Sequence, residues 1–192
     1  MQTLGLDPST PRTEGRLKSL LWPSVANDAD VDYLTTQGFW ICFLVAAVTL
    51  AVSIVSGLYA GALDAIFFYL GGNGVRQRSR IAAVCVFLVY ALGTVDLARV
   101  SYAAGGSGSI VRFLLCALLL TNMREVWIAS QWRSSGVAEE TPDPLSETLA
   151  DTTADRVPGI VWPKTRYLFY AFALLEIGSL VFVLFVGHYR VA

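Results

Sequence analysis

The amino-acid sequence predicts an all-α, polytopic integral membrane protein, a bundle of five transmembrane helices of which the second is short. Composition is the first reason: of 192 residues, 55% are hydrophobic and 15% are charged, whereas soluble domains contain about 45–50% apolar and about 25% charged residues. The second reason is that the apolar residues form runs of about 20, the length that a helix needs to cross roughly 30 Å of hydrocarbon. The third is that very few Lys and Arg residues lie inside these runs.

Residues 1–37 are predicted to form a cytoplasmic N-terminal segment. Residues 11–22 place three leucines on one helical face and basic residues elsewhere, a pattern typical of an amphipathic helix on an anionic leaflet. The first 20 residues contain no apolar signal-peptide core, so we expect the first span to direct insertion. Three acids precede that span, Asp28, Asp30 and Asp32. Acidic side chains interact favourably with a helix N-terminus, and we therefore expect them to begin the helix.

Residues 38–133 are predicted to contain four helices. The first, about residues 38–56, carries no charge; the third covers about 79–98 and the fourth about 109–128. The second, about residues 58–75, is long enough to cross by only a narrow margin.

Glycines at both ends of the second apolar run leave two interpretations open. Gly57 and Gly61 allow a tight reversal or a close helix contact, and three more glycines near residue 72 predict that the helix ends early. In one interpretation the run is a short second crossing. In the other it is a re-entrant or interfacial helix that returns to its own side, which leaves four crossings.

Residues 134–163 are predicted to form an acidic cytoplasmic loop, and residues 164–192 the fifth transmembrane helix with a short outer tail. Within the loop, residues 144–157 favour one short helix, which we expect Pro158 and Gly159 to end. The last apolar run, about residues 167–187, carries Glu176 near its middle.

The distribution of basic residues favours five crossings with a cytoplasmic N-terminus, because Lys and Arg in short loops are retained on the cytoplasmic side. Five crossings leave three basic residues outside, Arg99, Arg112 and Arg190, and eleven inside: Arg12, Arg16, Lys18, Arg76, Arg78, Arg80, Arg124, Arg133, Arg156, Lys164 and Arg166. Four crossings would give a weaker division of eight against six. We expect the protein in a plasma or inner membrane.

Charged groups inside hydrocarbon cost roughly 2.5–3.5 kcal/mol each on insertion scales, so each one needs a partner or a purpose. For Glu176 we expect either a hydrogen bond to Asn122 or Thr121, or a role in carrying protons. Arg124 would have to extend toward the middle of the bilayer to pair with Glu176. We expect Arg124 and Glu125 to extend to the membrane–water interface instead.

Four further charged residues are predicted to lie near the outer boundary: Asp64, Asp96, Arg99 and Arg112. Mutual ion pairs that fix helix order are the first interpretation of this group. A polar vestibule for an ion or a small polar solute is the second.

The sequence favours no enzyme class. Three cysteines that lie within apolar runs and a single histidine, His188, predict neither a metal site nor another cofactor. The sequence has no basic stripe of the kind that neutralises phosphates, so it does not predict nucleic-acid binding. The leading hypothesis is a small non-enzymatic protein that acts through helix packing or as an accessory subunit, with the lipid bilayer and other membrane subunits or further copies of itself as partners. The alternative is a small transporter or channel subunit that uses Glu176 and the outer charges. A membrane-embedded enzyme is the third hypothesis.

Overall fold

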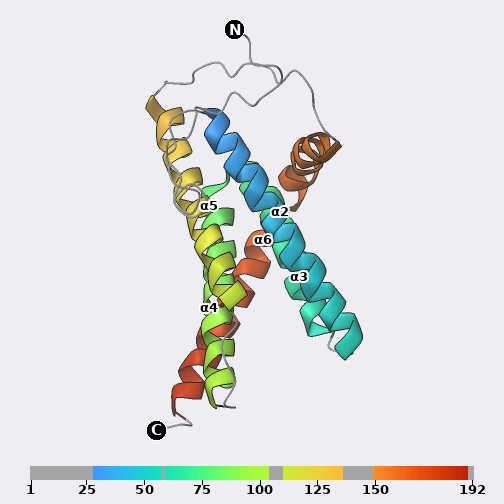
Figure 1. Ribbon diagram of the computed structural model, residues 1–192, viewed down its shortest axis with the longest axis vertical. Coiled ribbons are helices and arrows are strands. Elements are labelled where there is room, and N and C mark those ends of the chain that lie inside the picture. Colours follow the sequence, from blue (N-terminus) through green and yellow to red (C-terminus); the bar gives the residue numbers. More distant parts are fainter. Residues whose placement is uncertain (1–27, 58, 104–109, 136–148, 190–192) are drawn as a thin grey trace.

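A computed structural model describes residues 28–57, 59–103, 110–135 and 149–189 of the chain. These residues form five helices (Figure 1), namely α2 (Asp28–Ser56), α3 (Ala60–Arg76), α4 (Arg80–Ala103), α5 (Ile110–Ser135) and α6 (Leu149–Tyr189). No strand occurs in the described part of the chain, so the all-α prediction is confirmed there. Asp28, Asp30 and Asp32 lie in the first two described turns of α2. The predicted amphipathic helix at 11–22 lies outside the described residues.

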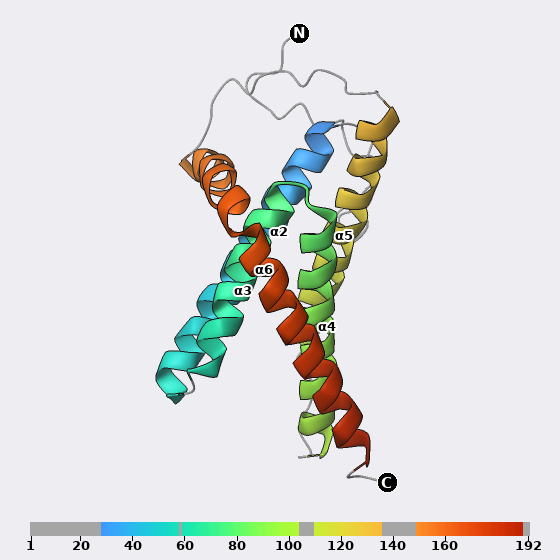
Figure 2. The same ribbon diagram turned by 180° about the vertical axis from the view of Figure 1, so that it is seen from behind.

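Successive helices run in opposite directions. Helices α2 and α3 form one antiparallel hairpin and α4 and α5 form a second, while α6 crosses between the two (Figures 1 and 2). The two hairpins are close where α3 ends and α4 begins, and they diverge toward the turn between α2 and α3. We name these two levels the Arg76 end and the Tyr59 end of the bundle.

The centre of the packing is the glycine-rich second half of α3, where the sequence suggested that the helix ends early. That prediction is wrong: Gly71, Gly72 and Gly74 are all buried inside α3. A Cβ atom on Gly74 would lie 2.5 Å from Ala82 Cβ of α4 and 2.5 Å from Trp162 Cη2 of α6. A Cβ on Gly72 would lie 2.8 Å from Cys42 Cβ of α2. Small residues let helix backbones approach closely, and these glycines therefore allow three helices to pack directly on α3.

Aromatic rings fill the space beside the glycines. Phe67 of α3 stacks on Phe169 of α6 with 5.1 Å between ring centroids, and Trp162 lies 5.4 Å from Phe169. Phe67 and Phe169 are both fully buried. Such ring pairs contribute about 0.5–1.5 kcal/mol beyond the area that they bury, so this stack adds to the contact between α3 and α6.

Helix α6 continues through Pro158, Gly159 and Pro163, which corrects the prediction that Pro158 and Gly159 end a separate helix. Proline inside a helix removes one hydrogen bond and bends the axis. The first turns of α6 accordingly lie at a steep angle to the remainder (Figures 1 and 2). Ala154 and Pro158 are fully buried, and this packing holds the bent segment in place. Tertiary contacts here outweigh the local helix-breaking preference.

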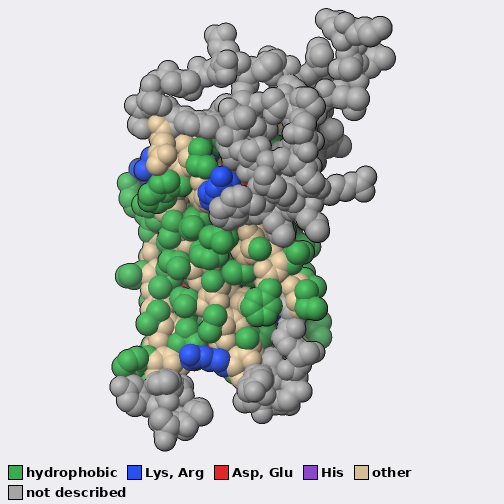
Figure 3. Space-filling model, turned by 60° about the vertical axis from the view of Figure 1, so that its left-hand side comes forward, with side chains coloured by type: hydrophobic (Ala, Val, Ile, Leu, Met, Phe, Trp, Pro, Cys, Tyr) green, Lys and Arg blue, Asp and Glu red, His purple; other side chains and the backbone are tan. Residues whose placement is uncertain are grey.

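Four of the described helices are long and apolar enough to cross a membrane, over Val31–Ser56, Arg80–Val100, Ile110–Gln131 and Thr152–Val186. Helix α3 has only 17 residues. Large apolar side chains are exposed on these helices, among them Val55 (89%) and Leu174 (77%). Figure 3 shows a broad hydrophobic band on one face, with Lys and Arg side chains above and below it. Exposed apolar patches of this extent are typical of membrane or protein contact surfaces.

Candidate functional site

Two acidic side chains lie close to each other between α3 and α6, Asp64 and Glu176, and both are partly exposed. The antiparallel register of the two helices explains the meeting. Trp162 packs on Gly74 and Phe169 packs on Gly71. Glu176 follows Phe169 at the same spacing of seven residues at which Phe169 follows Trp162. Positions seven apart lie on the same face of a helix, so Glu176 lies on the face of α6 that packs on α3, and Asp64 lies seven residues, about two turns, before Gly71.

Two carboxyl groups this close repel each other when both are ionised, because like charges in a medium of low dielectric interact strongly. From the sequence, Asn122 or Thr121 was expected to be the hydrogen-bond partner of Glu176. Thr121 donates to its own helix, to Ala117 O at 3.0 Å, and Asn122 donates to Leu118 O at 2.9 Å.

The predicted group of four charges does not assemble. The ion pairs of the described residues join none of Asp64, Asp96, Arg99 and Arg112 to one another. Arg99 instead donates a hydrogen bond to the Leu184 carbonyl of α6, at 3.5 Å. Arg112 is exposed. The mutual ion-pairing prediction is therefore wrong for these four described residues.

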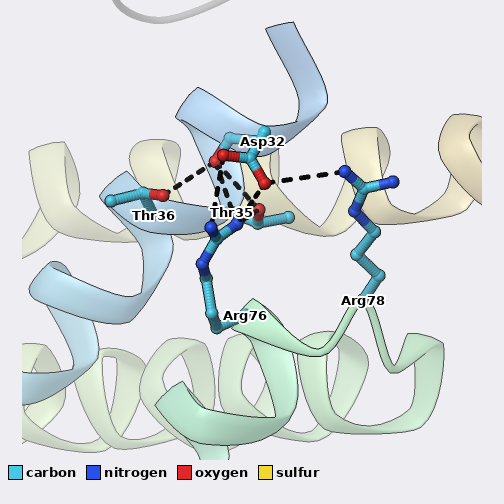
Figure 4. Close-up of polar contacts among 5 residues, drawn as sticks. All are labelled: Asp32, Thr35, Thr36, Arg76 and Arg78. Carbon is cyan, nitrogen blue, oxygen red and sulfur yellow. Dashed lines mark hydrogen bonds and ion pairs between the residues drawn. The ribbon is translucent and has the colours of Figure 1, made fainter. Parts of the chain in front are cut away.

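A second polar site joins α2 to α3 at the Arg76 end (Figure 4). Arg76 Nη1 donates to Asp32 Oδ1 at 2.6 Å and Arg76 Nη2 donates to Asp32 Oδ2 at 3.2 Å, a two-pronged ion pair. Arg76 Nη1 also donates to Thr35 Oγ1 at 3.0 Å. The Arg76 side chain is 8% exposed and that of Asp32 is 50% exposed. Bidentate arginine–carboxylate pairs fix orientation as well as distance, so this contact sets the register of α2 against α3.

Arg78 reaches the same carboxylate from an unusual backbone position. Its φ angle is 54°, in the left-handed region that favours glycine. The turn after α3 requires this angle, because Arg78 N donates to Val75 O at 2.9 Å and Ser79 N donates to Gly74 O at 3.0 Å, the pattern that closes many helices. Arg78 Nη2 lies 3.6 Å from Asp32 Oδ1 (Figure 4). An arginine therefore occupies a glycine position, and its side chain adds a second positive charge beside Asp32.

Further polar side chains are buried between helices. Asn122 is 4% exposed, and a Cβ on Gly38 of α2 would lie 2.5 Å from its Oδ1 atom. Gly38 thus provides the space for an asparagine of α5 against α2. Glu125 is 0% exposed, so the prediction that it extends to the interface is wrong. Arg124, the next residue toward the N-terminus, is half-buried.

Sequence reasoning missed the partner of Asp32 and the burial of Glu125. Asp32 was assigned to the helix N-terminus, although its spacing of one helical turn from Thr35 and Thr36 places three polar groups on adjoining positions. Nothing in the sequence alone pairs it with Arg76, which is 44 residues away. Glu125 lies beside Arg124 in the sequence, and adjacency alone did not reveal that Glu125 is fully buried while Arg124 is half-buried.

Within the described residues, no group of three or more His, Cys, Asp or Glu side chains could hold a metal ion. Comparison with protein-family models, curated proteins and solved structures found no match. Asp64 and Glu176 form a contact between acidic groups of α3 and α6.

Proposed function

We propose that this chain is an integral membrane protein that crosses the bilayer five times, with α3 as a complete second crossing. The support is the position of the two ends of α3 along α2. Near its beginning, Gly61 lies against Ser53, whereas Arg76 at its end binds Asp32. Ser53 and Asp32 are 21 residues apart on one continuous helix, about 32 Å at 1.5 Å per residue. A segment that returned to its own side would have both ends at one end of α2.

The length of α6 fits this arrangement. Its apolar stretch from Thr152 to Val186 contains 35 residues, about 52 Å of helix against roughly 30 Å of hydrocarbon. The bend at Pro158 and Pro163 divides it into a surface segment and a crossing segment, with the exposed residues Lys164 and Arg166 near the boundary. Arg76, Arg78 and Arg80 lie at the Arg76 end, which the positive-inside rule assigns to the cytoplasm. The N-terminus is then cytoplasmic.

The function that this geometry supports best is non-enzymatic: the chain acts through helix packing, as an accessory subunit of a membrane assembly. One observation carries the proposal, namely that three polar contacts among the described residues each lie between two helices. Asp32–Arg76 joins α2 to α3, Asp64–Glu176 joins α3 to α6, and Asn122 packs on Gly38 between α5 and α2. Polar contacts of this kind specify which helices associate, because lipid tails supply no hydrophobic driving force between helices.

One observation favours a second candidate function, proton-linked transport. Ionisable residues inside a membrane mark proton relays and ion pathways in many pumps and transporters. Asp64 and Glu176 come from two different helices, and both are partly exposed. The outer vestibule that the sequence suggested does not assemble, so this candidate depends on the carboxyl pair alone.

A flux measurement separates the two candidates. Purified full-length protein is placed in liposomes that contain a pH-sensitive dye, and proton entry is followed under an imposed membrane potential. The accessory-subunit proposal predicts flux no greater than in empty liposomes, together with lower unfolding stability for Glu176→Leu. Flux that Glu176→Gln abolishes, and that Asp96→Asn on α4 leaves unchanged, would overturn that proposal in favour of transport.

A further inference from the structure

We propose that α4 and α5 form, at the Arg76 end of the bundle, a binding site for the phosphate group of an anionic phospholipid, with Arg80 and Trp127 at its centre. The proposal rests on the membrane arrangement proposed above, which places the Arg76 end at the cytoplasmic leaflet. It goes beyond helix packing, because it names a class of ligand and the side chains that bind it.

Arg80 and Trp127 contact each other across the two helices. The guanidinium carbon of Arg80, the first residue of α4, lies 5.5 Å from the centre of the Trp127 ring on α5. Both side chains lie at the surface: Arg80 is exposed, and Trp127 is 50% exposed. The ring attracts the positive charge but supplies no oxygen acceptor. The N–H donors of the guanidinium can therefore bind the oxygens of a phosphate, which arginine matches in geometry.

Arg80 differs from the two other arginines of the same basic turn. Arg76 and Arg78 both lie beside the Asp32 carboxylate, with nitrogen–oxygen distances of 2.6 and 3.6 Å (Figure 4). In the part of the chain that the structure describes, Arg80 contacts the Trp127 ring and takes part in no ion pair. The first two arginines thus lie against α2, whereas Arg80 presents its charge at the surface, where an anion would complement it.

The position of the pair along the two helices matches the depth of lipid phosphates. The apolar span of α4 begins at Arg80, and that of α5 ends at Gln131, four residues after Trp127. Trp side chains are enriched at the membrane–water interface, at the level of the headgroups. Anions also interact favourably with the N-terminal end of a helix. A phosphate at this level would therefore meet a positive charge, the beginning of α4 and an interfacial ring together.

An exposed apolar face continues along α4 from this end. Ile81 and Leu88 are 56% and 38% exposed, and they lie seven residues apart, on one face of the helix. The acyl chains of a lipid whose phosphate binds Arg80 would lie along this face, whereas a soluble phosphate compound would leave it uncovered. Anionic phospholipids are present in the cytoplasmic leaflet, and basic groups between transmembrane helices on that side are typical binding sites for their headgroups.

A binding titration tests the site in the full-length protein. The protein is purified in a nonionic detergent and titrated with phosphatidylglycerol that carries a fluorescent label on one acyl chain. Unlabelled phosphatidylglycerol, phosphatidylcholine and glycerol phosphate then compete with the labelled lipid. The proposal predicts that phosphatidylglycerol competes at lower concentrations than the other two. Equal competition by phosphatidylcholine would show that the negative headgroup is not recognised, and equal competition by glycerol phosphate would assign the site to a soluble compound. Either result would overturn the proposal.

Substitutions assign the binding to Arg80. Arg80→Gln should raise the dissociation constant for phosphatidylglycerol about fivefold, equivalent to about 1 kcal/mol, the contribution of one Lys or Arg near an anionic lipid surface. Arg80→Lys keeps the charge and should retain most of the affinity. Trp127→Leu removes the ring that holds Arg80 and should also weaken binding. Arg112→Gln is the matched control, because it removes one positive charge from an exposed position at the opposite end of α5. It should leave the dissociation constant unchanged.

Unfolding by SDS first establishes which variants are folded. If Arg80→Gln does not fold, the comparison of Arg80→Lys and Trp127→Leu with Arg112→Gln decides the question. Equal effects of Arg80→Gln and Arg112→Gln, or full affinity in both Arg80→Gln and Trp127→Leu, would overturn the site. Failure of the five-crossing arrangement would show separately, in cysteine labelling on the two sides of the membrane, because binding in detergent does not depend on sidedness.

Discussion

Gly74→Ala is expected to lower the free energy of unfolding by about 1–3 kcal/mol, the cost of overpacking a filled core. The added Cβ would lie 2.5 Å from Ala82 Cβ, an atom fixed to the α4 backbone, and 2.5 Å from the Trp162 ring. Neither neighbour can turn aside as the end of a long side chain could, so α3 must move away from both helices. Unfolding by SDS in mixed micelles, followed by tryptophan fluorescence, measures the change.

Gly93→Ala is the matched control for this prediction. Gly93 also lies inside a helix, α4, but a Cβ there would meet no atom within 4 Å. Replacing glycine by alanine in a helix interior stabilises by roughly 0.5–1 kcal/mol when space allows, so this variant should be at least as stable as the original. Equal stability changes for Gly74→Ala and Gly93→Ala would contradict the close packing of α3, α4 and α6.

Asp32→Ala is expected to cost about 2 kcal/mol, the range for hydrogen bonds to charged groups. The substitution leaves the Arg76 guanidinium, whose side chain is 8% exposed, without its two-pronged carboxylate. The cost stays below that of a fully buried pair because Asp32 itself is 50% exposed and water can partly replace it. The same unfolding measurement reports the loss.

Asp32→Glu and Asp96→Asn complete this experiment. Glu at position 32 keeps the charge but shifts the carboxylate by one methylene, so it should restore part of the stability. Asp96→Asn removes an acid that takes no part in the ion pairs of the described residues. It should change the free energy of unfolding little. If Asp32→Ala proved as stable as Asp96→Asn, the Asp32–Arg76 contact could not be fixing α2 against α3.

Composition and charge placement predicted that the apolar runs are helices, and for two of them the expected bounds are close to the observed ones. The expected run at 79–98 became α4, Arg80–Ala103, and the expected run at 58–75 became α3, Ala60–Arg76. Apolar runs of that length have few alternative structures, because long apolar segments are either buried in protein or lie in lipid as helices.

Predictions of helix ends from local helix propensity were wrong where the energy of tertiary packing exceeded that propensity. Gly71, Gly72 and Gly74 suggested a helix end, yet they lie inside α3 because three neighbouring helices need the space of a missing Cβ. Pro158 suggested another end, yet α6 passes through it. In both places the energy of contacts from distant parts of the chain exceeds a propensity of about 1 kcal/mol for glycine or about 3 kcal/mol for proline.

The candidate site was predicted in its members but not in its pairing. Glu176 and Asp64 were both identified as costly intramembrane acids, but the sequence has no feature that places residues 112 positions apart side by side. Their meeting depends on the register of α3 against α6, which the Gly74–Trp162 and Phe67–Phe169 contacts set. Periodicity identifies the face of each helix, whereas register is a property of the packed pair.

Labelling of single cysteines in intact cells tests the central claim, that α3 crosses the membrane completely. In a chain without Cys42, Cys85 and Cys116, cysteine is introduced at Tyr59 before α3 or at Gln77 after it, both exposed positions. A membrane-impermeant maleimide should label Tyr59→Cys from outside, and Gln77→Cys only after the cells are permeabilised. Labelling of both positions from the same side would contradict the five-crossing arrangement.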